Sequence, residues 1–125
     1  MRAGLATLAF VALGCGEAAE VTLPPNDHFG LRNYQWGLVT RDPVCCTFGV
    51  EMITYNETKG IVTPNVRVRF IGTVQDRADT LFGTSDHNGK LYIAWRTGYQ
   101  RGTAVNEACP ETSSASCESH QYTFQ

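Results

Sequence analysis

The cysteines are the residues whose type and spacing constrain the chemistry of this chain most. Of the five in the sequence, Cys45 and Cys46 are adjacent, whereas Cys109 and Cys117 lie far along the chain. A metal or redox centre would need a Cys-x-x-Cys pair or a cysteine–histidine array with suitable spacing, and the sequence contains neither. We therefore expect structural disulfides.

The pairing of these four cysteines is only partly constrained. A bond between the adjacent Cys45 and Cys46 would close a small, strained ring, so we expect each of them to bond separately with Cys109 or Cys117. Such bonds would fasten the polar loop 110–116 to a strand that begins near residue 45. Which cysteine bonds with which stays open, because four cysteines allow three pairings. None of the four is expected to keep a free thiol.

Aspartates and a histidine in the second half of the chain are the next candidates for chemistry. Asp86 and His87 are neighbours in the segment 86–89, as in the beginning of an acid–base pair, and Asp76 and Asp79 offer further oxygen ligands for calcium. Aspartate in a tight turn typically bonds the local backbone, and the spacing of the three aspartates matches no calcium loop. We expect a solvated acidic loop that holds no metal.

The common catalytic signatures are absent from the sequence. It has no Gly-x-Ser-x-Gly elbow, no His-Glu-x-x-His pair and no glycine loop that cradles phosphate. We expect a protein that is not an enzyme and binds no cofactor. Exposed aromatic residues can form sugar- or protein-binding faces. The alternation described next assigns Trp36 and Trp95 to the core and leaves Tyr92 and Tyr99 as surface candidates.

Apolar and polar residues alternate along most of the chain, as they do in half-buried strands. The residues on the mainly apolar side of each segment are Tyr34, Trp36 and Leu38; Cys46, Phe48, Val50 and Met52; Val66, Val68 and Phe70; Leu91, Ile93 and Trp95; and His120, Tyr122 and Phe124. Turn signals separate these segments, among them Asn88-Gly89. No stretch after residue 14 has apolar residues at helical spacing over a length that predicts an α-helix. The pattern predicts an all-β protein with antiparallel sheets packed face to face.

The amino terminus has the layout of a secretory signal, with a basic start, an apolar stretch over residues 3–13 and small residues after it. An apolar run of about a dozen residues is too short to cross a bilayer, which needs roughly 20. Residues 12–15, Ala-Leu-Gly-Cys, resemble the lipobox of bacterial lipoproteins. The resemblance implies cleavage after Gly14 and a lipid on Cys15. The alternative is ordinary cleavage after Ala18 or Ala19, which would release a soluble protein.

Cysteine count and charge bear on where the protein acts. Either cleavage removes Cys15 as a thiol and leaves four cysteines, which can pair completely, and disulfides persist outside the cytosol. The formal net charge is −2 and there is no basic cluster, so we expect no nucleic-acid partner. We expect an exported protein held at the membrane of the cell envelope by the lipid on Cys15. A soluble periplasmic or secreted protein is the alternative.

A series of turn and strand motifs occupies residues 50–125. In order they are Gly60-Ile61-Val62-Thr63-Pro64-Asn65, Val66-Arg67-Val68-Arg69-Phe70, Thr84-Ser85-Asp86-His87-Asn88-Gly89, Leu91-Tyr92-Ile93-Ala94-Trp95-Arg96-Thr97-Gly98, Gly102-Thr103-Ala104-Val105-Asn106-Glu107-Ala108 and Thr123-Phe124. Their order and spacing resemble the bacterial immunoglobulin-like domains of the invasin and intimin type. The resemblance implies an antiparallel immunoglobulin-like β-sandwich. A transthyretin-like or carboxypeptidase-regulatory-like sandwich, which also has an Asp-x-x-Gly turn before a strand, is the alternative.

These expectations divide the chain into a signal peptide over residues 1–14, a lipidated tether over 15–30 and the immunoglobulin-like sandwich over 31–125. The expected function is that of a non-catalytic binding or structural module of the cell envelope. It would contact a partner protein or surface through the loops of the sandwich. The alternatives are a small-ligand or carbohydrate-binding module and a secreted enzyme whose site has no recognised motif.

Overall fold

The structure is a computed structural model that describes residues 23–41 and 46–125. The described residues contain eight β-strands and no helix. The strands are β2 (Phe29–Arg41), β3 (Cys46–Asn56), β4 (Ile61–Val62), β5 (Arg67–Val74), β6 (Arg77–Thr84), β7 (Lys90–Arg96), β8 (Gly102–Pro110) and β9 (Glu118–Phe124). The predicted signal peptide and Cys15 lie outside the described residues. Within them, the structure has no helix that could span a membrane.

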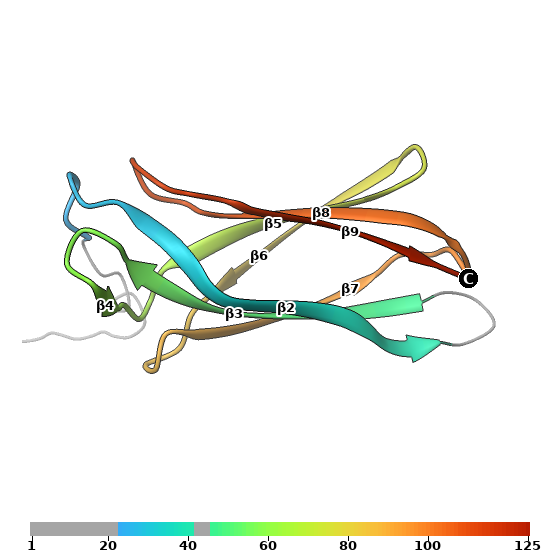
Figure 1. Cartoon of the computed structure of the whole chain (residues 1–125), viewed down its shortest axis with the longest axis horizontal. Helices are drawn as coiled ribbons and strands as arrows, with labels where there is room; N and C mark the ends of the chain where they lie inside the picture. The colour runs from blue at the N-terminus through green and yellow to red at the C-terminus, as the bar shows by residue number, and fades with distance from the viewer. Residues whose placement is uncertain (1–22, 42–45) are drawn as a thin grey trace, which may run out of the picture.

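The strands form two antiparallel sheets. In the first sheet, β3 pairs with β2 along one edge and with β7 and the short β4 along the other. The second sheet has the order β6-β5-β8-β9. Figure 1 shows the two sheets as two layers of an elongated sandwich, with β2, β3 and β7 in one layer and β5, β8 and β9 in the other.

The strand order is immunoglobulin-like. If the strands other than the two-residue β4 are lettered A to G along the chain, the sheets are A-B-E and D-C-F-G. The constant-type immunoglobulin domain has A-B-E-D and C-F-G, so the two arrangements differ only in which sheet the fourth strand joins. The predicted all-β, immunoglobulin-like sandwich is confirmed. The first strand begins at Phe29, so Phe29 and Gly30 belong to the sandwich and not to the predicted tether.

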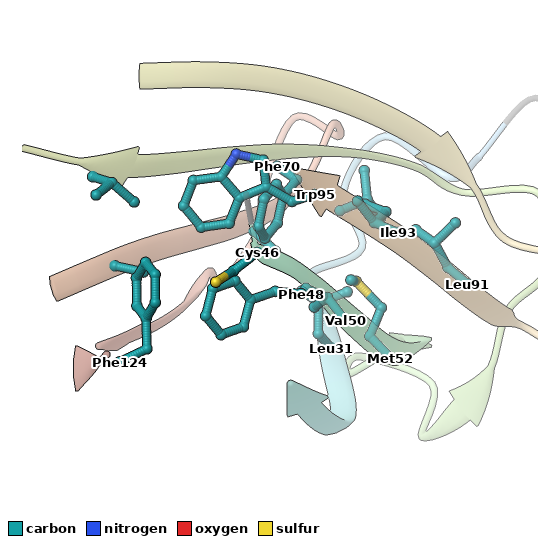
Figure 2. Close-up of a cluster of buried hydrophobic side chains, with 14 residues drawn as sticks. Leu31, Cys46, Phe48, Val50, Met52, Phe70, Leu91, Ile93, Trp95 and Phe124 are labelled. Carbon is teal, nitrogen blue, oxygen red and sulfur yellow. The ribbon is translucent and has the colours of Figure 1, made fainter. Parts of the chain in front are cut away.

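The predicted alternation gives the inner faces of the two sheets. Figure 2 shows the buried side chains that meet between the layers, with Trp95, Phe70 and Phe48 at the centre. The core consists of Leu31, Cys46, Phe48, Val50, Met52, Val68, Phe70, Val74, Leu91, Ile93, Trp95, Ala104, Ala108 and Phe124. Trp36 packs against this cluster from β2 and is only half-buried. The alternation of period two therefore predicted the buried face of the central strands.

The expectation of a solvated acidic loop is wrong for residues 77–84. The segment between Asp76 and Asp86 is strand β6 and not a solvated loop, and Asp79 lies within it. The Asp79 carboxylate accepts a hydrogen bond of 2.9 Å from the indole N–H of Trp95. Because a buried indole N–H needs an acceptor, Asp79 completes the packing of Trp95.

The disulfide also differs from the expected pairing. Cys109 is bonded to Cys117, whereas Cys46 is buried with a free thiol and Cys45 lies outside the described residues. The bonding of Cys109 and Cys117 to the adjacent cysteines, predicted above, is therefore wrong. The β8–β9 hairpin is the physical reason. It pairs Ala108 with Glu118, so Cys109, which follows Ala108, and Cys117, which precedes Glu118, lie opposite each other at a Cα–Cα distance of 4.3 Å.

The loop 110–117 is fastened at a different place from the one expected. Its backbone runs beside the start of β2, where the Phe29 N–H donates to the Ser114 carbonyl (3.0 Å) and the Ser116 N–H donates to the Phe29 carbonyl (2.9 Å). Both ring nitrogens of His28 lie 2.7 Å from a serine hydroxyl, one on Ser114 and the other on Ser116. The loop therefore closes one end of the sandwich, and His28 links it to the first strand.

Peptide mapping checks the disulfide. Trypsin should release residues 102–125 as one peptide that contains both Cys109 and Cys117 and no internal cleavage site. We expect the non-reduced peptide to be lighter than its reduced form by two hydrogen atoms and linked to nothing else. Linkage to the tryptic peptide 42–59, which contains Cys45 and Cys46, would contradict this pairing.

Candidate functional site

The outer face of the β2–β3–β7 sheet has two adjoining hollows. The larger has a volume of about 430 Å³ and is lined by residues that include Asn33, Asp86 and Lys90. The smaller has a volume of about 240 Å³. Both are lined by Gln35, Glu51 and Tyr92, which join them into one surface. We call this surface the outer-sheet groove. The larger hollow lies within the roughly 300–1,000 Å³ that is typical of ligand sites.

Strand register explains why the groove forms here. Gln35 on β2 pairs with Glu51 on β3, which pairs with Tyr92 on β7, so these three side chains form a polar row across the sheet. The neighbouring row on the same face, two residues further along each strand, is Gly37, Gly49 and Ala94, in which no side chain is larger than a methyl group. A row of long side chains beside a row of small ones leaves a depression in the sheet surface, and this depression is the smaller hollow.

Tyr92 is the most exposed aromatic residue of the groove. It is 54% exposed, which confirms the prediction that it is a surface residue. Its phenol end lies over the neighbouring strand, because a Cβ atom built on Gly49 would come within 2.5 Å of the Tyr92 hydroxyl and 3.0 Å of two ring carbons. Because Gly49 has no side chain, the Tyr92 ring can lie against the surface of the sheet.

A β-bulge in β2 shapes the other side of the groove. The register with β3 shifts between Arg32 and Gln35, and Asn33 has a positive φ of 53°. The extra residue allows both Leu31 and Tyr34 to face the core, which strict alternation along β2 would forbid. Bulges of this kind re-aim side chains at the surface, and here the bulged Asn33 lines the larger hollow.

Substitution of Asn33 tests the bulge. Asparagine tolerates the left-handed conformation, whereas a β-branched residue does not. We expect Asn33→Val to lower the free energy of unfolding by about 1–2 kcal/mol. Asn33→Gly should change it by less than about 1 kcal/mol, because glycine adopts positive φ without strain. Urea unfolding curves measure both values, and equal losses for the two variants would contradict a left-handed Asn33.

The groove has an uneven distribution of charge. Glu51 and Asp86 contribute carboxylates to the larger hollow and Lys90 contributes an ammonium group. The Asp86 carboxylate accepts hydrogen bonds from the N–H groups of Lys90 (2.9 Å) and Asn88 (2.8 Å), which lower its pKa below the usual 3.8. Asp86 therefore stays ionised at neutral pH. Since its pKa is lower in the folded than in the unfolded chain, it stabilises the turn above pH 3.8, and this contribution is lost as the pH falls toward the folded value.

The other residues singled out in the sequence are not brought together in the groove. The turn 86–89 is built by Asp86 as expected, and His87 is exposed within it. Tyr99 packs against the core and is partly buried. Glu107 lies with Cys109 and Cys117 in a cluster of metal-ligand type, but both sulfurs are in the disulfide and a metal needs thiolates. That cluster can offer a metal only its carboxylate.

A second polar cluster, which sequence reasoning missed, joins β2 to the second sheet. The Tyr34 hydroxyl donates a hydrogen bond of 2.7 Å to the side-chain carbonyl of the fully buried Asn106, and the Tyr34 ring stacks on His120 at 4.9 Å. Burial, with a smaller effect from Glu118, raises the pKa of the Tyr34 phenol. The phenol is therefore neutral and bonded inward, so this cluster fastens the sheets and offers no nucleophile. The one feature of the sequence that could have indicated this cluster is Asn106, a polar residue at an inward position of β8.

The predicted lipid-bearing Cys15 lies outside the described residues, and the likeness to the invasin and intimin domains stays a prediction drawn from the motifs. Comparison with known proteins yielded no matching family model, no matching curated protein and no matching solved structure.

Proposed function

We propose that this protein is an exported, non-catalytic binding module that a lipid on Cys15 anchors in the cell envelope. It binds its partner at the outer-sheet groove. The observation that carries the proposal is the row of Gln35, Glu51 and Tyr92, which is common to both hollows. This surface replaces the loops that the sequence favoured as the contact region.

Two features support an exported location. The lipobox-like residues 12–15 lie at the end of an apolar stretch of signal length. The Cys109–Cys117 disulfide is of a kind that persists in oxidising compartments and is rare in the cytosol.

The chemistry of the groove supports binding more than catalysis. Hydrolysis of a glycoside, for example, takes two carboxyl groups of which one stays protonated to act as the acid. Asp86, whose pKa two backbone N–H groups lower, could act only as the ionised one of the pair, and its Oδ1 already accepts hydrogen bonds from the backbone of Asn88 and Lys90. A fixed anion beside an exposed aromatic ring is well suited to recognition.

The anchor is tested by metabolic labelling with a fatty-acid probe. The wild-type protein should incorporate the probe and Cys15→Ala should not. An unlabelled wild type would refute the anchor and leave a soluble secreted protein.

The binding surface is tested on insoluble envelope material of the producing cells, freed of lipid by extraction so that the lipid on Cys15 has nothing to enter. Full protein in detergent micelles should bind this material, and Tyr92→Ala should bind at least about tenfold more weakly, as is usual when a central aromatic residue is truncated. Phe82→Ala is the matched control, because Phe82 is 48% exposed on β6 in the other sheet. Equal loss in both variants, or no binding by the wild type, would overturn the proposed function.

A further inference from the structure

We infer that the outer-sheet groove binds an uncharged carbohydrate chain, with one sugar ring stacked on Tyr92. The inference rests on the proposed function and names the class of ligand for the same surface. Three properties of the groove lead to it: an exposed aromatic ring, polar side chains free to bond a ligand, and the sign of the charge.

Tyr92 offers a platform for a sugar ring. The face of an aromatic ring carries negative charge, and the C–H groups on one side of a pyranose are weakly positive, so the two surfaces attract each other. The ring is 54% exposed, and Gly49 beneath its phenol end keeps it close to the sheet. A tyrosine held in this position can stack on a ligand without first being ordered, which favours affinity.

The side chains around Tyr92 can bond sugar hydroxyls. A hydroxyl both donates and accepts, and the groove offers the amides of Asn33 and Gln35, the Glu51 carboxylate and the Lys90 ammonium. Within residues 23–41 and 46–125, no hydrogen bond or ion pair involves any of these four side chains, although Lys90 lies near enough to Asp86 to help lower its pKa. Their polar atoms are therefore available to a ligand and do not have to exchange one protein contact for another.

The charge of the groove argues for an uncharged sugar. Two carboxylates, on Glu51 and Asp86, face the larger hollow beside one ammonium group, on Lys90. Because Asp86 is held ionised by its backbone bonds, an acidic sugar would meet like charge there. A neutral sugar meets acceptors for its hydroxyl protons without this repulsion.

The extent of the groove argues for a chain. The hollows of about 430 and 240 Å³ adjoin along the strands and have Tyr92, Glu51 and Gln35 in common. In the smaller one, Gly37 has open space in front of it, with no heavy atom within 4 Å of an added Cβ. A sugar on Tyr92 would therefore have room for a neighbouring unit over Gly37.

Treatment of the lipid-extracted envelope material separates this inference from the proposed function. Periodate, which cleaves the bond between carbons that carry vicinal hydroxyls, should lower binding of the full protein at least about tenfold, whereas exhaustive proteolysis should leave binding unchanged. Loss of binding after proteolysis but not after periodate would overturn the carbohydrate inference and keep the proposed function. Absence of binding to untreated material would overturn both.

Two further measurements sharpen the result. Periodate-sensitive binding should be competed by soluble neutral polysaccharide released from the envelope and not by its acidic fraction; the reverse would overturn the uncharged ligand. Gly49→Ala keeps every lining side chain but displaces the Tyr92 phenol, so it should weaken binding while Tyr92→Phe keeps most of it. Wild-type affinity in Gly49→Ala, with its unfolding midpoint unchanged, would contradict stacking on Tyr92.

Discussion

Replacing Trp95 with alanine is expected to lower the free energy of unfolding by about 3–5 kcal/mol. Trp95 is 2% exposed at the centre of the core, with Phe70 at 5.8 Å and Phe48 at 6.0 Å between ring centroids. Alanine would leave a cavity between the sheets and remove the indole N–H that bonds Asp79. Because small domains are stable by only about 5–15 kcal/mol, the loss would take a large part of the total. Chemical denaturation monitored by circular dichroism measures it.

Gly72 provides the control for this packing. A Cβ atom at Gly72 would come within 2.5–2.6 Å of three atoms of the Trp95 indole, so Gly72→Ala should cost about 1–3 kcal/mol in the wild type. In the Trp95→Ala background the clash is gone, and the same change should be neutral or stabilise by up to about 1 kcal/mol. Equal costs in the two backgrounds would mean that the indole does not lie on Gly72.

Loss of the Cys109–Cys117 disulfide is expected to lower the free energy of unfolding by about 2–3 kcal/mol. The sequence separation of the two cysteines is 8 residues, so the bond constrains a short loop in the unfolded chain. The same loop closes one end of the sandwich through Ser114, Ser116 and His28. Unfolding of the double variant Cys109→Ser/Cys117→Ser, compared with the wild type, measures the effect.

A reducing agent provides the control for the disulfide. Dithiothreitol should lower the stability of the wild type to that of the double variant and should leave the double variant unchanged. A further fall in the double variant would reveal another stabilising disulfide. Wild-type stability that is insensitive to the reductant, at a concentration shown to open the bond, would contradict the expected contribution.

The alternation of the central strands was readable from the sequence. Residues 46–52, 66–70 and 91–95 place an apolar side chain at every second position, and a strand turns alternate side chains to opposite faces. Since one face must be buried, this pattern determined both the all-β class and most of the core. The exposure of Tyr92 followed from the same rule, because it lies between the buried Leu91 and Ile93.

Strand β6 was not readable in this way. Its inward positions are Asp79, Leu81 and Gly83, only one of which is a large apolar residue. Asp79 faces inward because Trp95, from a strand of the other sheet, needs an acceptor for its N–H. The need of Trp95 for an acceptor cannot be read from the sequence around Asp79. Asp79 and Gly83 therefore hid the alternation of apolar and polar residues in β6.

For the cysteines too, the sequence predicted one property and the contacts between strands decided another. Their even number, once Cys15 is set aside, predicted that disulfides could form. The partner of Cys109 was decided by the β8–β9 hairpin, which places Cys117 opposite it, and not by the count.

What the sequence determined by itself was the set of residues on each face of its regular strands, because that depends only on a period of two along the chain. The tertiary structure alone decided which strands are neighbours. The disulfide partner depends on the register of β8 with β9, and the bulge at Asn33 depends on that of β2 with β3. The row of Gln35, Glu51 and Tyr92 also needs the register of β3 with β7, which is distant from it in sequence. Register is set by the packing of the whole sandwich, so the candidate site became visible only in the fold.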